Sequence, residues 1–248
     1  MTLTEFFREN PKVALGFSGG VDSSYLLYAA IAAGADVRPY YIQTAFQPQF
    51  ERADAKRLAA QLGVELTVLA LDVFANPAVT ANPADRCYHC KHALFGTLAR
   101  RAAADGYPVL MDGTNASDDA GDRPGMRALR ELSVRSPLRE AGLTKTEIRR
   151  LSREAGLFTW DKPAYACLAT RVPSGTPLDA ETLSRVEGAE SALFALGYTN
   201  FRCRVFHGAA RLQLPAAQLE RAVKERAAVR SALAPYFETV LLDLAERS

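Results

Sequence analysis

Residues 18–23, with the sequence SGGVDS, place two glycines among hydroxyl and carboxylate side chains in one short segment. An apolar run precedes the segment and a helical pattern follows it, which predicts a loop between a strand and a helix. Gly19 and Gly20 allow the backbone to approach a ligand closely. The free amides of the first helical turn favour an anion, and Ser18 and Ser23 add hydroxyl donors. The pattern predicts a phosphate site, and the alternative is a tight turn with incidental serines.

Two of the four cysteines, Cys87 and Cys90, lie three residues apart in RCYHCK. This spacing suits a metal ion, an iron–sulfur cluster or a redox dithiol. Cys167, in ACLATR, is a candidate third thiolate, and a zinc site that adds His89 or His92 is an alternative. Cys203 lies on a predicted strand and is interpreted as a buried structural residue.

Further polar residues follow the fourth predicted strand. Asp112, Gly113, Thr114 and Asn115 stand where parallel sheets bind ligands, at the carboxyl end of a strand. Arg135 and Lys145 carry positive charges that suit phosphate or pyrophosphate, although each could also be an ordinary surface residue.

The elements that position these residues alternate between strand and helix in the first 155 residues. Short apolar runs predict strands at 12–17, 37–42, 65–72 and 108–113, and helical spacing predicts helices at 22–33, 50–62, 90–104 and 144–155. Thr144 and Glu147 have the spacing of a capping box at the last of these helices. The alternation predicts an α/β fold with a parallel sheet and crossover helices.

The pattern changes after residue 156. Residues 161–178 are rich in proline, glycine and small residues, which predicts a functional loop or a domain junction. Residues 179–248 then predict a smaller α+β domain, with helices at 179–196 and 215–231 and strands at 201–206, 210–214 and 237–243. The expected domains are therefore 1–160, the junction 161–178 and 179–248.

The composition is that of an ordinary globular protein. The net charge is +2, from 30 basic and 28 acidic residues, which argues against a dedicated nucleic-acid binder. No apolar run approaches the roughly 20 residues of a membrane span. The N-terminus carries acidic residues and no apolar core of a signal peptide, so a cytoplasmic location is expected.

The segment SGGVDS resembles the signature of the PP-loop ATP pyrophosphatases. The resemblance implies a doubly wound, adenine nucleotide alpha hydrolase-like domain that binds ATP and cleaves it to AMP and pyrophosphate. It also implies that Asp22 helps hold Mg²⁺, which neutralises charge on the leaving pyrophosphate. The alternative for Asp22 is an acidic residue that favours the helix N-terminus.

Four longer segments are similar to the LarE family of ATP-dependent sulfur transferases, and they are residues 82–95, 112–128, 134–149 and 162–177. The resemblance implies an enzyme of nickel-pincer nucleotide cofactor biosynthesis. Its substrate is pyridinium-3,5-biscarboxylic acid mononucleotide, whose carboxylate is adenylated and becomes a thiocarboxylate. Thr170 stands where the family has serine, which keeps the hydroxyl. Ser174 stands where the family often has an aromatic residue, which puts a stacking contact there in doubt.

The resemblance implies roles for individual residues. The expected ATP-binding residues are Ser18, Gly19, Gly20, Asp22, Ser23, Gly113, Arg135 and Lys145. The expected substrate-binding residues are Tyr88, Thr170, Arg171, Glu190, Arg202 and Arg204. Arg202 and Arg204 would bind the phosphate of the mononucleotide, and the alternative is a pair of solvated arginines. Glu187 and Glu190 are candidates for an acidic residue near the substrate or metal, with solvated helical carboxylates as the alternative.

Cys167 occupies the position of the family's sulfur donor, and Arg171 would favour its thiolate. In sacrificial members this cysteine becomes dehydroalanine after one turnover. Members with all three cysteines resemble cluster-dependent enzymes, in which Cys87, Cys90 and Cys167 would hold a [4Fe-4S] cluster that carries an extra sulfide. The cluster, the sacrificial cysteine and zinc remain alternatives, and the sequence does not identify the sulfide donor.

Family members are similar to hexamers, so a homo-oligomer is expected. Two other functions compete with this assignment. One is a PP-loop tRNA-thiolation enzyme or another adenylating ligase, and the other is a nucleotide-binding module without turnover. Salt-sensitive tRNA binding would favour the first, and a lack of pyrophosphate release would favour the second.

Overall fold

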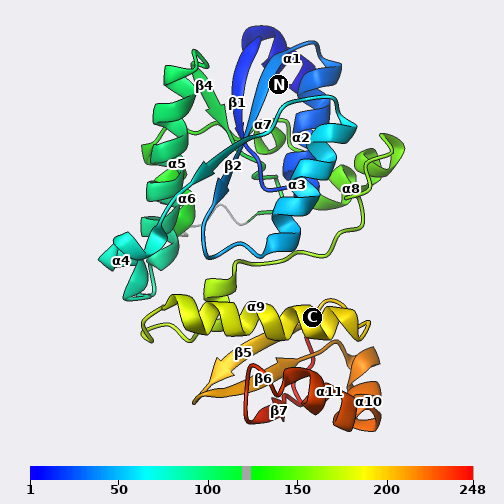
Figure 1. Cartoon of the computed structure of the whole chain (residues 1–248). Helices are drawn as coiled ribbons and strands as arrows, with labels where there is room; N and C mark the ends of the chain where they lie inside the picture. Colours follow the sequence, from blue (N-terminus) through cyan, green and yellow to red (C-terminus); the bar gives the residue numbers. More distant parts are fainter. Residues whose placement is uncertain (119–123, 248) are drawn as a thin grey trace. The chain divides into compact units, whose positions relative to one another are not determined.

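The computed structural model describes residues 1–118 and 124–247, and these fall into two compact units (Figure 1). The first unit comprises residues 1–44, 49–73 and 85–162. The second comprises residues 45–48, 74–84 and the chain from 163 onward. Within the described residues, no helix combines the length and the apolar character that crossing a membrane requires.

The first unit is built on a parallel sheet of four strands, in the order β3-β2-β1-β4. The strands are β1 (Lys12–Gly16), β2 (Asp36–Gln43), β3 (Thr67–Ala70) and β4 (Val109–Met111). The prediction of an α/β fold with a parallel sheet is confirmed. The predicted strand at 65–72 is shorter in the structure. Pro39 is tolerated inside β2 because pairing with β3 begins only at Tyr40, so the missing amide does not interrupt that ladder.

Helices pack on both faces of this sheet because successive residues of β1 point to opposite sides. Val13 and Leu15 join an apolar cluster with residues of α1, α2, α3, α7 and α8, whereas Ala14 joins a cluster with residues of α5 and α6 (Figure 1). The helices are α1 (Leu3–Glu9), α2 (Val21–Ala32), α3 (Gln49–Gln61), α5 (Arg86–Ala104), α6 (Pro124–Glu131), α7 (Pro137–Glu140) and α8 (Lys145–Glu154).

Several of these helices differ from the sequence-based prediction. The helix predicted at 90–104 begins at Arg86, so Cys87 and Cys90 lie inside its first turns. Helices α1, α6 and α7 were not predicted. The capping box at α8 is confirmed, since the Thr144 hydroxyl accepts from the Glu147 amide and the Glu147 carboxylate accepts from the Thr144 amide.

The second unit contains a three-stranded sheet in the order β5-β6-β7. Strands β5 (Arg202–Phe206) and β6 (Ala209–Gln213) are antiparallel, and β7 (Val240–Leu242) runs parallel to β6. The helical elements are η1 (Val73–Ala75, which begins in the first unit), α4 (Pro77–Thr80), η2 (Leu168–Arg171), α9 (Ala180–Ala195), α10 (Ala216–Lys224) and α11 (Arg226–Leu233). The single helix predicted at 215–231 is wrong: the chain breaks at Glu225, whose ψ is 16°.

Two short stretches from the first half of the chain bond to residues 168–178 within this second unit. The Leu168 amide donates to the Phe46 carbonyl at 2.9 Å, and the Leu178 amide donates to the Thr80 carbonyl at 2.8 Å. The buried Asn82 side chain donates to the carbonyls of Pro173 and Thr176, both at 2.9 Å. The proline-rich segment is therefore held at the start of η2 and again after η2.

Gly113 sets how closely the end of β4 approaches the N-terminus of α2. A Cβ atom at this position would lie 2.9 Å from the Ser23 amide nitrogen and 3.3 Å from the Asp22 Cβ. Both neighbours belong to the first turn of α2, so the backbone would have to shift.

We predict that Gly113→Ala lowers the free energy of unfolding by about 1–3 kcal/mol, because the added methyl group overpacks a backbone contact. Urea unfolding measures the change. The control is Gly96→Ala, in the interior of α5, where the added Cβ has, apart from its own helix backbone, the flexible end of Arg100 as its nearest neighbour, at 3.7 Å. The free energy of unfolding of that variant should rise by about 0.5–1 kcal/mol, because alanine has a higher helix propensity than glycine. Equal stabilities for the two variants would contradict the contact.

Candidate active site

The loop after β1 folds around hydrogen bonds between its own serines. The Ser18 and Ser23 hydroxyls lie 3.1 Å apart, and the Ser23 hydroxyl donates to the Gly20 carbonyl at 3.3 Å. Gly20 is the N-cap of α2 and has no side chain to occupy the first amides of the helix. Those amides remain available for an anion at the positive end of the helix dipole.

Gly19 allows this loop to lie against α3. Its φ is +72°, a conformation that favours glycine, and a Cβ atom there would lie 3.0 Å from the Ala55 backbone. The loop is also held from the segment that follows α8, since Lys162 pairs with Asp54 of α3 at 2.7 Å and its Nζ lies 3.4 Å from the Gly19 carbonyl oxygen. Lys162 was not predicted as a site residue, because no local pattern links it to the loop.

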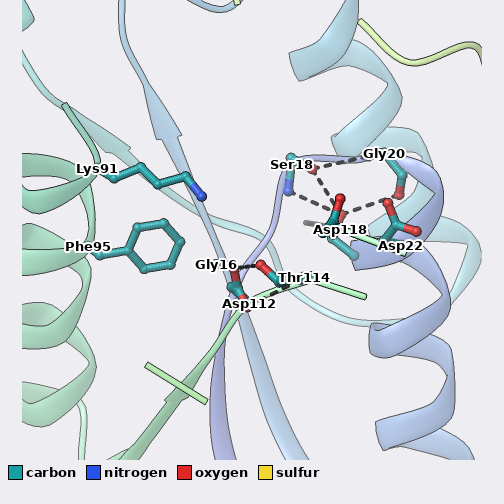
Figure 2. A pocket seen from close by; sticks show the side chains of 11 residues that line it. Gly16, Ser18, Gly20, Asp22, Lys91, Phe95, Asp112, Thr114 and Asp118 are labelled. Carbon is teal, nitrogen blue, oxygen red and sulfur yellow. Dashed lines mark hydrogen bonds between the residues drawn. The ribbon is translucent and has the colours of Figure 1, made fainter. Parts of the chain in front are cut away.

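A cavity of about 230 Å³ lies beside the loop (Figure 2). Its lining combines predicted and unpredicted residues, and they are Gly16, Ser18, Gly20, Asp22, Ser23, Lys91, Phe95, Asp112, Gly113, Thr114 and Asp118. Figure 2 shows the Lys91 and Phe95 side chains extending from α5 toward the side that holds Ser18 and Asp22. Lys91 and Phe95 are four residues apart on one helix face, which is the only sequence signal that they act together.

Asp22 already has two partners in this arrangement. Lys145 Nζ lies 2.5 Å from Asp22 Oδ2, and the Asn115 amide lies 3.3 Å from Oδ1. The structure thus brings together two predicted residues, Asp22 and Lys145, as an ion pair. A metal ion at Asp22 would have to share the carboxylate with Lys145 or displace it.

Asp112 is a second carboxylate at this cavity, and it is buried. It accepts hydrogen bonds from the Thr114 hydroxyl at 2.5 Å and the Ser136 hydroxyl at 2.7 Å. These hydroxyls fix its orientation, so Asp22 and Asp112 both offer oxygen ligands of the kind that Mg²⁺ takes.

Arg135 is not among the residues that line this cavity. Its guanidinium pairs with both Glu140 oxygens, at 2.9 and 2.5 Å, and lies over the Phe6 ring. The hydrogen bond from Arg135 holds the pKa of the Glu140 carboxyl below its usual value. The predicted role of Arg135 in ATP binding therefore requires this pair to open.

In the second unit, a buried ion pair joins η2 to α9. Arg171 Nε lies 2.7 Å from Glu190 Oε1, and the two side chains are 0% and 2% exposed. Glu190 also accepts from the Tyr165 hydroxyl and from the Cys203 amide, the latter at 2.8 Å. The alternative that Glu190 is a solvated helical carboxylate is thus wrong. Burial alone would lower the pKa of Arg171, but the hydrogen bond and charge of Glu190 outweigh it and raise that pKa.

Arg171 also determines the conformation of the segment that carries Cys167. Its Nη1 donates to the Ala166 carbonyl at 2.9 Å and to the Thr170 hydroxyl at 2.8 Å. The Thr170 hydroxyl in turn donates to the Cys167 carbonyl at 2.8 Å. Cys167 is partly exposed and directly precedes η2.

A second cavity, of about 460 Å³, lies within the second unit. It is lined by Ala166, Thr170, Arg202, Arg204, Gln213, Glu246 and Arg247. Arg202 is 8% exposed, so the alternative of two solvated arginines is wrong for this residue. The structure brings three predicted residues, Thr170, Arg202 and Arg204, into one cavity. Glu246 and Arg247 were not predicted.

The four cysteines have different environments. Cys87 is exposed and Cys90 is partly exposed, and their spacing of three places both on one face of α5. Cys203 is fully buried, and burial raises the pKa of its thiol to about 12, which agrees with a structural role. Across residues 1–118 and 124–247, no three His, Cys, Asp or Glu side chains form a group that could hold a metal ion.

The side chains around the CxxC pair have other partners. His89 Nε2 lies 3.4 Å from an Asp85 carboxylate oxygen. The Tyr88 hydroxyl donates to Glu131 at 2.7 Å, and the Arg127 guanidinium lies 4.0 Å from the Tyr88 ring centre. One face of the Tyr88 ring is therefore in contact with a cation from α6.

Comparisons with known proteins place these features in context. No family model matches the chain. The chain is 39% identical over 226 residues to an uncharacterized protein, slr1717, of Synechocystis, and this match covers 90% of the chain and 84% of the relative. It is 32% identical over 220 residues to a pyridinium-3,5-bisthiocarboxylic acid mononucleotide synthase of Lactiplantibacillus plantarum, covering 88% of the chain and 80% of the relative. It is also 26% identical over 196 residues to the tRNA-specific 2-thiouridylase MnmA of Thermotoga maritima, covering 61% and 54%.

We predict that Glu190→Gln lowers the free energy of unfolding by about 3–5 kcal/mol, because it leaves the buried Arg171 charge without its carboxylate. Urea unfolding followed by circular dichroism measures the loss. The control is Glu238→Gln, an exposed residue outside the cavity lining, which should change stability by less than about 0.5 kcal/mol. A loss at Glu190 no larger than that of the control would show that the ion pair does not hold the unit together.

Proposed function

The chain belongs to the LarE family of PP-loop enzymes, and from this membership we propose that it is an ATP-dependent sulfur transferase. Its substrate is pyridinium-3,5-biscarboxylic acid mononucleotide, and its product carries a thiocarboxylate that serves the nickel-pincer nucleotide cofactor. The observation that carries the proposal is the 32% identity, over 88% of the chain, to a synthase whose name states this product.

ATP binds in the first unit, in our proposal, with its phosphates at the loop between β1 and α2. Ser18, Gly19, Gly20 and Ser23 surround the phosphates, and this arrangement is supported by the uncapped amides of α2. Asp22 would hold Mg²⁺, which when bound would neutralise charge on the phosphate oxygens. Lys145 then leaves Asp22 and pairs with a phosphate oxygen, which exchanges one anionic partner for another.

Three domain assignments form part of this proposal. Residues 1–160 are the doubly wound ATP domain, residues 161–178 carry the sulfur chemistry, and residues 179–248 bind substrate and mediate oligomerisation. The family similarity further suggests a cytoplasmic hexamer that binds no membrane or nucleic acid.

Substrate binding falls to the cavity of the second unit. Arg202 and Arg204 bind the phosphate of the mononucleotide, and the Thr170 hydroxyl is a neighbouring donor. Tyr88 is retained as a candidate contact, with Arg127 against one face of its ring. The Glu190 oxygens are occupied by Arg171, Tyr165 and the Cys203 amide, so we assign Glu190 a positioning role.

The reaction proceeds through an acyl adenylate. A substrate carboxylate oxygen attacks the α-phosphate of ATP, and pyrophosphate leaves. A sulfur nucleophile then attacks the acyl carbon, and AMP leaves with its bonding electron pair. When the nucleophile is the Cys167 thiolate, the product is a thioester. Loss of the Cys167 Cα proton breaks its Cβ–S bond, which yields the thiocarboxylate and dehydroalanine.

A [4Fe-4S] cluster is the alternative sulfur source, and the donor set fits it in part. Cys87 and Cys90 offer two thiolates on one face of α5, and Cys167 offers a third from the other unit. Cysteine thiolates are the usual ligands of such clusters. When bound, the cluster would supply a sulfide in place of the Cys167 sulfur, and the enzyme would then turn over repeatedly. Zinc at the same cysteines is the remaining alternative.

The test of the function is an anaerobic incubation of the protein with ATP, Mg²⁺ and the biscarboxylic acid mononucleotide. We expect AMP, pyrophosphate and a product in which sulfur has replaced one oxygen, detected by mass spectrometry. Thiolated tRNA in a parallel incubation would instead establish the tRNA-thiolation alternative. Nucleotide binding with no pyrophosphate release in either incubation would establish the non-enzymatic alternative.

We predict that Asp22→Ala slows pyrophosphate release by about 100-fold or more, because charge on the leaving group is no longer neutralised through the metal. A coupled phosphate assay measures the rate, and circular dichroism checks the fold. Glu65→Ala, at an exposed residue before β3, is the matched control and should retain the wild-type rate. Near-normal release by the Asp22 variant would remove the assignment of the loop.

The cysteines distinguish the two sulfur sources. If the cluster is the source, Cys87→Ala, Cys90→Ala and Cys167→Ala should each abolish iron binding and multiple turnover, measured by metal analysis and product yield. Cys203→Ala is the control and should keep the iron, because Cys203 is buried and bound to no other thiol. If Cys167 is the source, Cys87→Ala should retain one turnover per chain. Cys167 should then lose about 34 Da, the mass of H₂S, on formation of dehydroalanine.

A further inference from the structure

The cavity of about 460 Å³ in the second unit lies on the face of the three-stranded sheet that is opposite its apolar core. Arg202 and Arg204 are two residues apart on β5 and share one face, on which Arg202 pairs with Gln213 and Arg204 with Arg211. Cys203 points the other way and is buried together with Leu212. Apolar packing therefore uses the opposite face of the sheet and does not require the face that carries the arginines to be covered.

The C-terminal segment brings an additional arginine to this face. After β7, the Asp243 amide donates to the Leu212 carbonyl and the Arg247 amide donates to the Leu214 carbonyl, both at 2.9 Å. The segment thus continues beside β6 to the end of the described chain. Arg247 Nη1 donates to the Phe201 carbonyl at 2.9 Å, and Arg202 Nη1 donates to the same oxygen at 2.8 Å. Two guanidinium groups consequently meet at one carbonyl.

The guanidinium groups of this cavity are bound by neutral oxygens. Arg202 donates to the carbonyls of Phe201 and Ala164, and Arg204 donates to the Gln213 side chain and the Thr170 carbonyl. Within the described residues, none of Arg202, Arg204 and Arg247 forms an ion pair with a carboxylate. Among the described residues that line the cavity, Glu246 is the one acidic side chain, so three positive charges face a single negative charge there.

The surroundings make this excess of positive charge unfavourable without a ligand. Burial lowers the pKa of Arg202 to about 10, and the charges of Arg171 and Arg247 add to the effect. Burial and Arg171 also lower the pKa of Arg247. A dianion would relieve the repulsion, and a phosphate monoester carries a charge of about −1.5 to −2 at pH 7.

We propose that Arg247 is a third guanidinium of the phosphate subsite, so that the C-terminal segment completes the substrate pocket. Arg202, Arg204 and Arg247 surround the phosphate monoester of the mononucleotide, and Glu246 reduces affinity by opposing the same charge. This inference rests on the proposed function for the identity of the ligand. The negative charge of the ligand, by contrast, is inferred from the cavity geometry alone.

The experiment compares Arg247→Ala with wild type in binding two ligands, the biscarboxylic acid mononucleotide and its dephosphorylated nucleoside. Isothermal titration calorimetry measures both. A hydrogen bond to a charged group corresponds to a loss of about 10- to 100-fold in affinity. We expect that loss for the mononucleotide and no change for the nucleoside, whereas Glu246→Gln should tighten mononucleotide binding. Arg230→Ala, an exposed arginine of α11 outside the lining, is the control of equal charge and should change neither affinity.

The outcomes separate this inference from the proposed function. Equal losses for the two ligands, or none, would overturn the role of Arg247 while the substrate assignment stands. If the mononucleotide does not bind to wild type, inorganic phosphate serves as the probe. Phosphate binding that Arg247→Ala weakens and Arg230→Ala does not would uphold the anion subsite and reject the substrate, and binding indifferent to Arg247 would reject the subsite. Arg247→Lys keeps the positive charge and loses the bidentate guanidinium. We expect this variant to bind the mononucleotide with an affinity between those of wild type and Arg247→Ala, a result that a purely structural effect of the alanine would not produce.

Discussion

The buried ion pair between Arg171 and Glu190 is the interaction on which the second unit depends. Both side chains have lost nearly all contact with water, and such a pair is tolerated only when its remaining donors and acceptors are satisfied. They are satisfied here by groups from separate elements: the Tyr165 hydroxyl, the Cys203 amide of β5 and the Ala166 carbonyl. One carboxylate of α9 therefore fixes the start of β5 and the segment before η2 together.

This arrangement changes the role that the sequence suggested for Arg171. A guanidinium beside a cysteine suggests an electrostatic activator of the thiolate. In the structure, Arg171 is paired with Glu190, and its donors orient Ala166 and Thr170. Arg171 therefore acts on Cys167 through the conformation of this segment in addition to its charge. The Cys167 carbonyl is held by Thr170, which leaves the partly exposed thiol at the start of a rigid helical turn.

The sequence revealed what is encoded locally. The glycines and serines at 18–23, the capping box at Thr144 and the alternation of strand and helix depend on neighbours within a few residues, and the parallel sheet followed from them. Four-residue helices such as α7 carry too little periodicity to be recognised. The break at Glu225 was missed because the helical pattern continues through it, and the hydrogen bonds of Glu225 with Arg221 and Tyr198 appear only after folding. Arg247 could not be placed because its position depends on where β7 brings the end of the chain.

The cations near the two cavities differ in what they bind before a ligand arrives. Lys145 and Lys162 of the first unit pair with Asp22 and Asp54, so a phosphate that engages either lysine exchanges a carboxylate for a phosphate oxygen. Arg202 and Arg204 of the second unit bind neutral carbonyl and amide oxygens, which hold the guanidinium groups in place and leave their charge uncompensated. A site whose guanidinium groups are already oriented and form no ion pair loses little conformational entropy, and breaks no ion pair, when it binds an anion. A site whose lysine is paired with a carboxylate favours a ligand that arrives with a bound metal ion. The metal ion can coordinate the carboxylate that the lysine leaves. MgATP meets the second requirement and a phosphate monoester meets the first, so the two charge arrangements suit the two ligands of the adenylation reaction that we propose.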